Sequence, residues 1–270
     1  MSNENSQPAF GARRFGTVNW LGLWTLYVKE VRRFLKVATQ TITAPVITTL
    51  LFLAVFAVAI AKYRPDVQGV PFVEFLAPGL VMMAMLQNAF ANTSSSLLIS
   101  KVQGNVVDIL MPPLSPAELN AGIALAGVTR GAVVGLVTTL CMWPFVHIGF
   151  DHLWAVIYFG LSASMMMSLL GMIGGIWSEK FDHLQAVTNF VIMPLTFLSG
   201  TFYSVRQLPD FAFTATQYNP IFYMIDGFRY GFTGHADGSI QVGVVVTLAL
   251  NVTLYAITEW MFRRGYRLKS

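Results

Sequence analysis

Three polar side chains recur at helical spacing inside an otherwise apolar stretch of the sequence. Asn88, Asn92 and Ser95 lie four and three residues apart within Phe75–Ser100, so an α-helix brings them to one face. An amide surrounded by lipid is costly unless a partner or water satisfies its hydrogen bonds. These side chains therefore either bond to a neighbouring helix, which we favour, or line a polar path for a substrate.

A single basic residue interrupts a second apolar stretch. Arg130 falls within Leu119–Val146, and a guanidinium at the centre of a membrane costs about 2.5–3.5 kcal/mol or more. We expect it in the cytosolic half of that stretch, where it extends toward the membrane surface. It meets either a structural partner, such as a backbone carbonyl or a phospholipid head, or the phosphate of a lipid or substrate. Arg130 thus joins Asn88, Asn92 and Ser95 as a candidate for the substrate pathway.

The sequence lacks the motifs of nucleotide binding and catalysis. It contains no GxxxxGK[S/T] phosphate loop, so a nucleotide that drives this protein would bind to another chain. The four histidines lack the spacing of metal ligands, and no set of serine, histidine and aspartate suggests a nucleophile. We expect no catalytic residue, no metal and no cofactor in this chain.

The composition is that of a membrane protein. Of the 270 residues, 55% are hydrophobic and only 11% are charged, whereas soluble domains carry about 25% charged residues. The net charge of +4 is modest, and the basic residues flank the apolar stretches. That distribution favours contact with a membrane over contact with nucleic acid. The predicted fold class is an all-α polytopic membrane protein.

Six stretches are long and apolar enough to cross a bilayer, which takes about 20 residues. The predicted transmembrane helices are Ile42–Ala61, Phe75–Ser100, Leu119–Val146, Leu153–Trp177, Leu184–Tyr203 and Ile240–Thr258. Of the 17 lysines and arginines, twelve lie on the side of the two termini and four on the other side. This excess predicts that both termini, and the loop 101–118, are cytosolic.

The segments outside these spans also have recognisable patterns. Val18–Val37 combines apolar residues at three- and four-residue steps with a charged side, which predicts an amphipathic N-terminal interface helix. Ser204–Ser239 is too aromatic for a free loop, so we expect either re-entrant outer helices between spans five and six or an aromatic belt at the interface. Within it, Asp226 and Arg229 are close enough to pair. The predicted divisions are a disordered tail (1–16), the interface helix (17–40), a six-span domain (41–262) with a cytosolic loop (101–118) and an outer region (204–239), and a basic tail (263–270).

Small residues recur at four-residue steps in the third and fourth spans. They form ridges that let helices approach closely, and we expect these ridges to pack within one subunit rather than to line a substrate path. The ridges are Gly127, Gly131 and Gly135; Gly160, Ser164 and Ser168; and Gly171 and Gly175.

The loop Lys101–Glu118 reads KVQGNVVDILMPPLSPAE. Val106–Met111 can form one or two helical turns before Pro112 ends them. Its apolar side chains have no core of their own. The loop is therefore either a docking element for a cytosolic partner or an ordinary connector.

Three motifs resemble the permeases of ATP-binding-cassette exporters of the type-2 class. They are GNVVDILMPPLSPAELNAG (104–122), FLSGTFYSVRQLPDF (197–211) and YNPIFYMIDGFRYGF (218–232). Their order and the predicted topology agree with that family over nearly the whole chain, and the chain is most similar to short bacterial permeases without a fused ATPase, including nodulation lipo-oligosaccharide exporters. The sequence departs from the family at Lys101-Val102-Gln103, where many relatives carry acidic residues.

The resemblance implies a role for each of these segments. Gly104–Ser115 would be a coupling helix that docks on a separate ATPase, and Val18–Val37 would lie beside it, with Arg32 and Arg33 facing lipid heads or the ATPase. The implied coupling residues are Gly104, Asp108, Ile109, Leu110, Pro112 and Pro113, and the implied outer-gate residues are Asn219, Pro220 and Arg229.

The resemblance also implies a function. The chain would be one of two identical permease subunits in a bacterial inner membrane, and its partner ATPase would bind ATP and Mg. The substrate would be amphipathic: a glycolipid, lipo-oligosaccharide, lipid or drug. The rival class is a secondary carrier or lipid-binding scaffold without an ATPase, but no Asp or Glu lies inside a predicted span to couple transport to an ion.

Overall fold

A computed structural model describes residues 18–63, 66–67 and 69–267 of the chain, without the side chains of Lys62, Ile109 and Leu110. The predicted tail at 1–16 lies outside these residues. The helices are α1 (Trp20–Leu35), η1 (Thr39–Thr43), α2 (Ala44–Ala59), η2 (Ala61–Tyr63), α3 (Phe72–Val102), α4 (Val106–Leu110), α5 (Pro116–Met142), α6 (Leu153–Trp177), α7 (Phe181–Val187), η3 (Thr188–Ile192), α8 (Met193–Leu198), η4 (Val205–Gln207), α9 (Asp210–Gln217), α10 (Pro220–Thr233) and α11 (Ile240–Arg264).

Five helices of the described chain are long and apolar enough to cross a membrane: 39–59, α3, α5, α6 and α11. They confirm the all-α polytopic class and five of the predicted spans. Helix α11 runs beyond its predicted end at Thr258 to Arg264, and Arg263 donates to Glu259 at 2.7 Å in its last turns, which supports the helix there. The start of the predicted basic tail is therefore helical.

The predicted fifth span is a succession of shorter helices. The chain from Phe181 to Leu198 forms α7, the π-helical η3 and α8, and it leaves the helical path before Gly200, whose φ is +79°. Pro194 is the second residue after η3, and proline disrupts the preceding turn because it lacks an N–H and its ring displaces the carbonyl four residues earlier. Pro45 stands in the same relation to η1. Six complete spans therefore remain a prediction.

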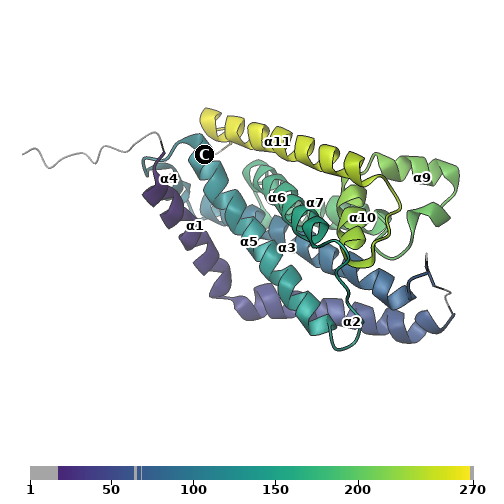
Figure 1. Ribbon diagram of the computed structural model, residues 1–270. Helices are drawn as coiled ribbons and strands as arrows, with labels where there is room; N and C mark the ends of the chain where they lie inside the picture. The colour runs from purple at the N-terminus through teal and green to yellow at the C-terminus, as the bar shows by residue number, and fades with distance from the viewer. Residues whose placement is uncertain (1–17, 64–65, 68, 268–270) are drawn as a thin grey trace, which may run out of the picture.

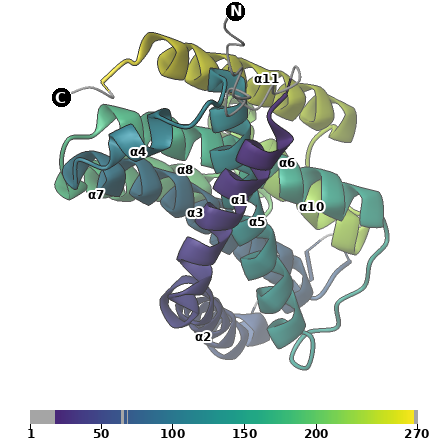
Figure 2. The same cartoon turned by 90° about the vertical axis from the view of Figure 1, so that its left-hand side faces the viewer.

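Helix α3 is the centre of the molecule. It packs against α2, α5, α6 and α10. In the most apolar stretch of 18 residues in this helix, 83% of the residues are buried. Figures 1 and 2 show α11 along one side of this bundle and α1 crossing α5 near α4. We call the end of the bundle that holds α4, the start of α1 and the end of α11 the α4 end; α9 lies toward the opposite end (Figure 1).

The small-residue ridges pack helices within the subunit, as predicted. A Cβ atom added at Gly127 or Gly131 of α5 would lie 2.2 or 2.6 Å from the Oγ of Ser168 or Ser164 on α6. A Cβ at Gly171 of α6 would lie 2.5 Å from the carbonyl oxygen of Phe90 on α3. The ridges therefore let α6 approach both α5 and α3 to backbone contact.

We expect Gly171→Ala to destabilise the protein by about 2 kcal/mol, because the new methyl group collides with the backbone of α3 and forces two buried helices apart. Gly174→Ala is the matched control, since its nearest neighbour would be 3.5 Å away, an ordinary contact. Thermal unfolding in detergent measures both variants. Equal unfolding midpoints for the two would show that α3 and α6 do not meet at Gly171.

Candidate functional site

The short helix α4 projects from the α4 end of the bundle. Gly104, with φ of +74°, ends α3 in a left-handed turn that other residues rarely adopt and redirects the chain into α4. Val107 and Met111 are 54% and 76% exposed, and Asp108, Pro112 and Pro113 are also exposed. The side chains of Ile109 and Leu110 lie outside the described part of the chain. An exposed apolar surface on so short a helix is typical of an interaction site.

The loop that follows α4 is fixed to the start of α1. The side chain of Asn19 donates to the carbonyl of Pro113 at 3.1 Å, and its backbone N–H donates to Glu118 at 2.6 Å. Glu118 also accepts from the backbone of Ser115 at 2.6 Å and completes a capping box that starts α5. These bonds tie α1, the two prolines and α5 into one unit. The S-P-A-E pattern of the sequence signals the capping box of Ser115 and Glu118. The sequence analysis did not identify Asn19 as a partner of this box.

A groove of about 290 Å³ separates α1 from the loop. It is lined mainly by apolar atoms, and Lys29 and Asp108 contribute its charges. The groove and the exposed side of α4 together form the surface that a partner at the α4 end would meet.

Lys101 has a structural role at the same end. Its Nζ donates to the carbonyl oxygens of Ile176 at 2.5 Å and Ser178 at 2.8 Å, so it caps the last turn of α6. This lysine therefore bonds within the chain.

We expect Lys101→Met to cost about 1–2 kcal/mol of stability, because two carbonyls at the end of α6 lose a charged donor. Lys180→Met serves as the control, because Lys180 is exposed and makes none of the described hydrogen bonds. Thermal unfolding measures the difference, and equal midpoints would argue against the cap.

The polar residues of α3 bond to neighbouring helices, as we favoured. Asn88 accepts from Arg130 of α5 at 2.9 Å. Asn92 accepts from Arg33 of α1 through its carbonyl at 2.7 Å and its side chain at 3.1 Å, and Ser95 lies 3.4 Å from the same guanidinium. Thus Arg33 of α1 and Arg130 of α5 contact one face of α3, at positions one helical turn apart. We call Arg33, Asn88, Asn92, Ser95 and Arg130, together with Glu30, the polar core.

Glu30 is the member of the polar core that sequence analysis missed. It is only 2% exposed, forms an ion pair with Arg33 at 3.0 Å and accepts from Ser96 at 2.7 Å. The expectation that Arg33 faces lipid heads or an ATPase is therefore wrong. Trp20 and Trp24 are instead exposed, at 71% and 61%, so α1 turns its charged pair inward and its tryptophans outward.

Arg130 lies near the middle of its helix rather than toward one surface. It is 14 residues from Pro116 in a 27-residue helix, or about 20 Å along the axis. Its guanidinium donates to the side chain of Asn88 at 2.9 Å.

Asn219, Pro220 and Arg229 hold the region opposite the α4 end together. Asn219 caps α10, which begins at Pro220, and donates to Leu195 at 3.1 Å and Ser199 at 2.7 Å. Arg229 is 3% exposed and donates to the carbonyls of Phe75 and Gly200 at 3.2 and 2.7 Å. These bonds join α10 to the end of α8 and the start of α3.

Asp226 and Arg229, which were predicted to pair, each form their hydrogen bonds with backbone groups and not with each other. Asp226 accepts from the backbone of Asp237 and Gly238 at 2.8 and 2.9 Å, since a turn there presents two free N–H groups. Arg229 uses carbonyls instead.

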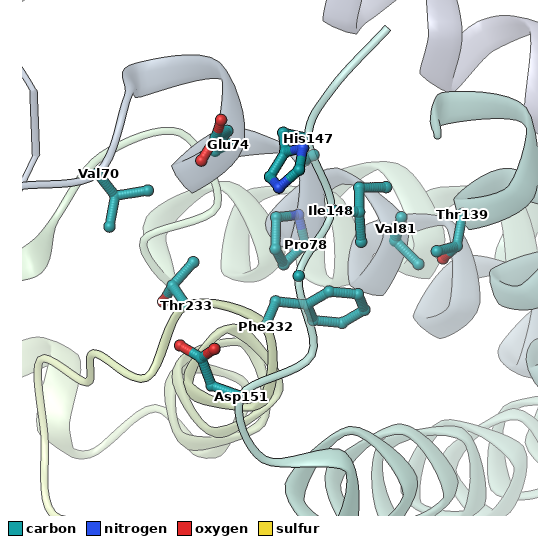
Figure 3. A pocket seen from close by; sticks show the side chains of 12 residues that line it. Val70, Glu74, Pro78, Val81, Thr139, His147, Ile148, Asp151, Phe232 and Thr233 are labelled. Carbon is teal, nitrogen blue, oxygen red and sulfur yellow. The ribbon is translucent and has the colours of Figure 1, made fainter. Parts of the chain in front are cut away.

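A pocket of about 270 Å³ opens between the start of α3, the loop after α5 and the end of α10. Figure 3 shows Glu74 and His147 on one side of it and Asp151 and Thr233 on the other. Among the described residues, no three His, Cys, Asp or Glu side chains are arranged to hold a metal ion.

The apolar helices define a polytopic membrane protein, with an exposed short helix at one end. A family model described as ABC-2 type transporter matches residues 22–233. The chain therefore belongs to the ABC-2 type transporter family.

Two relatives illustrate the range of similarity. The inner membrane transport permease YadH of Escherichia coli (strain K12) is 36% identical over 252 residues, which are 93% of this chain and 98% of that protein. Nodulation protein J of Rhizobium leguminosarum bv. trifolii is 24% identical over 258 residues, which are 88% of this chain and 93% of that protein. The earlier resemblance to type-2 exporter permeases is confirmed at the level of the family.

Proposed function

We propose that this chain is the membrane-spanning subunit of an ATP-binding-cassette exporter in a bacterial inner membrane. A separate subunit binds ATP and Mg and docks on α4, and two copies of the permease form the transport path. The substrate is amphipathic: a glycolipid, lipo-oligosaccharide, lipid or drug. We infer six spans with both termini and α4 in the cytosol, in line with the distribution of lysine and arginine.

The observation that carries this proposal is the way α4 is mounted. It exposes Val107 and Met111, yet the loop behind it is tied to α1 and α5 through Asn19 and Glu118. A force applied to α4 is thus passed to the starts of two helices. An ordinary connector has no need of such a support.

The polar core links a movement at this surface to the middle of the bundle. Asn19 caps the start of α1 beside the loop, and near the other end of this helix Arg33 contacts α3. A movement of α1 therefore changes the environment of Asn92 and, one turn away, of Asn88 and Arg130. Asn88, Asn92, Ser95 and Arg130 remain our candidates for the substrate pathway, and Asn219, Pro220 and Arg229 for an outer gate.

Co-purification tests the proposal. The tagged protein is extracted in mild detergent from native membranes, its partners are identified by mass spectrometry and Mg-dependent ATP hydrolysis is measured. We expect a nucleotide-binding subunit and ATP hydrolysis in the purified complex. A preparation without an ATPase would favour the rival class, a secondary carrier or lipid-binding scaffold.

A further inference from the structure

A groove between membrane-spanning helices combines a polar wall with an apolar one. It measures about 280 Å³ and lies between η1, α2, α3 and α8. Gln87 and Asn88 line it on α3, and Gln40 and Thr48 line it on η1 and α2. Its larger apolar side chains are Phe52, Met83, Met193 and Phe197. The groove is therefore suited to an amphipathic ligand.

None of the described residues that line this groove is charged. Arg130 lies outside the lining, and its guanidinium donates to the Oδ1 of Asn88 at 2.9 Å. The Nδ2 of Asn88 donates to the carbonyl of Ala84 at 3.0 Å, so both ends of this amide are already bonded within the protein. A charged group without an opposite charge beside it is costly in a region of low dielectric constant. The groove therefore favours an uncharged ligand.

Gln87 has unused hydrogen-bonding capacity in the wall of this groove. Among the described residues, its Nε2 is a buried atom without a hydrogen-bond partner, so no hydrogen bond from this nitrogen opposes a turn of the amide toward a ligand. Gln40 and Thr48 are exposed. Amide groups donate and accept hydrogen bonds, as hydroxyl groups do. Hydroxyl groups of a ligand therefore match these three side chains and would satisfy the unpaired donor.

We propose that this groove binds the uncharged sugar head of a glycolipid-like molecule. Gln87, Gln40 and Thr48 bond to its hydroxyl groups, and the apolar wall holds the start of its tail. The volume is just below the roughly 300–1,000 Å³ of most ligand pockets, so it suits one sugar ring and not a whole oligosaccharide. That the bound molecule is the transported substrate rests on the proposed function, whereas its binding does not.

The experiment uses the full-length permease, without an ATPase or ATP, in a polyoxyethylene detergent that has no sugar head. Its thermal midpoint is titrated with octyl glucoside, octyl phosphate and octyltrimethylammonium, each below the concentration at which it forms micelles. The three ligands share a tail and differ in the charge of the head. We expect octyl glucoside to bind roughly tenfold more tightly than either charged ligand, because only its head can bond to this wall without an unpaired charge.

Substitutions in the wall locate the binding. Gln87→Leu should weaken octyl glucoside binding roughly tenfold, since it removes the amide. The ligand-free variant should unfold at the same temperature or higher, because an unpaired buried donor is removed. Gln40→Leu changes the wall on η1 at an exposed position and should also weaken binding. Gln241→Leu is the matched control, since Gln241 is exposed on α11 outside the groove, and it should bind octyl glucoside like the wild type.

The series of ligands tests the site even if Gln87→Leu does not fold. Equal binding of the three ligands by the wild type, or tighter binding of either charged ligand, would overturn a site for an uncharged sugar. So would a preference for octyl glucoside that survives in Gln40→Leu and in every folded variant of Gln87.

This result is independent of the proposed function. If octyl glucoside is not preferred while a nucleotide-binding subunit co-purifies, the sugar site fails and the exporter proposal stands. If octyl glucoside is preferred and no ATPase is found, the site stands in a protein of another class.

Discussion

Replacing both Val107 and Met111 by aspartate is expected to weaken ATPase binding by roughly a hundredfold. Val107 lies on α4 and Met111 directly follows it, both side chains are exposed, and in the complex they would fill an apolar cleft of the partner. The two carboxylates would replace apolar contacts at the centre of the interface and would be desolvated on binding. We expect this change to weaken the binding free energy by about 3 kcal/mol. The permease itself should unfold at an unchanged temperature, because neither side chain belongs to its core.

Tyr63→Asp is the control for this double variant. Tyr63 is 80% exposed and belongs to η2, away from α4. Titration of the purified ATPase onto the immobilised permease measures both affinities. Similar affinities for the double variant and the wild type would mean that α4 is only a connector.

Removing Arg33 alone is expected to destabilise the protein by about 3–5 kcal/mol. Arg33→Met leaves the carboxylate of Glu30, which is 2% exposed, without its charged partner, and a buried unpaired charge is strongly destabilising. The second substitution Glu30→Gln should recover at least half of this loss. It removes the charge and keeps an acceptor for Ser96, which bonds to Glu30 at 2.7 Å.

Arg263→Met tests whether any arginine in an ion pair would have the same effect. It breaks a pair with Glu259 in which Arg263 is 70% exposed, and such pairs contribute about 0–1 kcal/mol. Unfolding in detergent compares the variants. A loss for Arg33→Met no larger than that of Arg263→Met would contradict the buried pair.

The sequence predicted the parts of the fold that depend on local pattern. Long uncharged stretches identified five spans, and the four-residue spacing of glycines identified the contacts of α6. The spacing of Asn88, Asn92 and Ser95 placed them on one face, and the cost of an amide in lipid correctly implied partners on other helices.

Features that depend on tertiary contacts were harder to predict. Glu30 lies among charged residues near the end of α1, where composition alone suggests a solvated face, and only the contact with α3 turns it inward. Helix α5 begins at Pro116, earlier than hydropathy indicates, and the depth of Arg130 in a membrane stays a prediction. Asp226 and Arg229 attract each other electrostatically, but nearby backbone groups take the hydrogen bonds of both side chains.

Site-specific cross-linking at Val107 tests the central claim most directly. A photoreactive amino acid is introduced at Val107, and in a parallel control at Tyr63, and native membranes are irradiated before mass spectrometry. Coupling through α4 predicts a cross-link from position 107, but not from position 63, to a nucleotide-binding subunit. If position 107 cross-links only to lipid, or to no protein, α4 does not couple this permease to an ATPase.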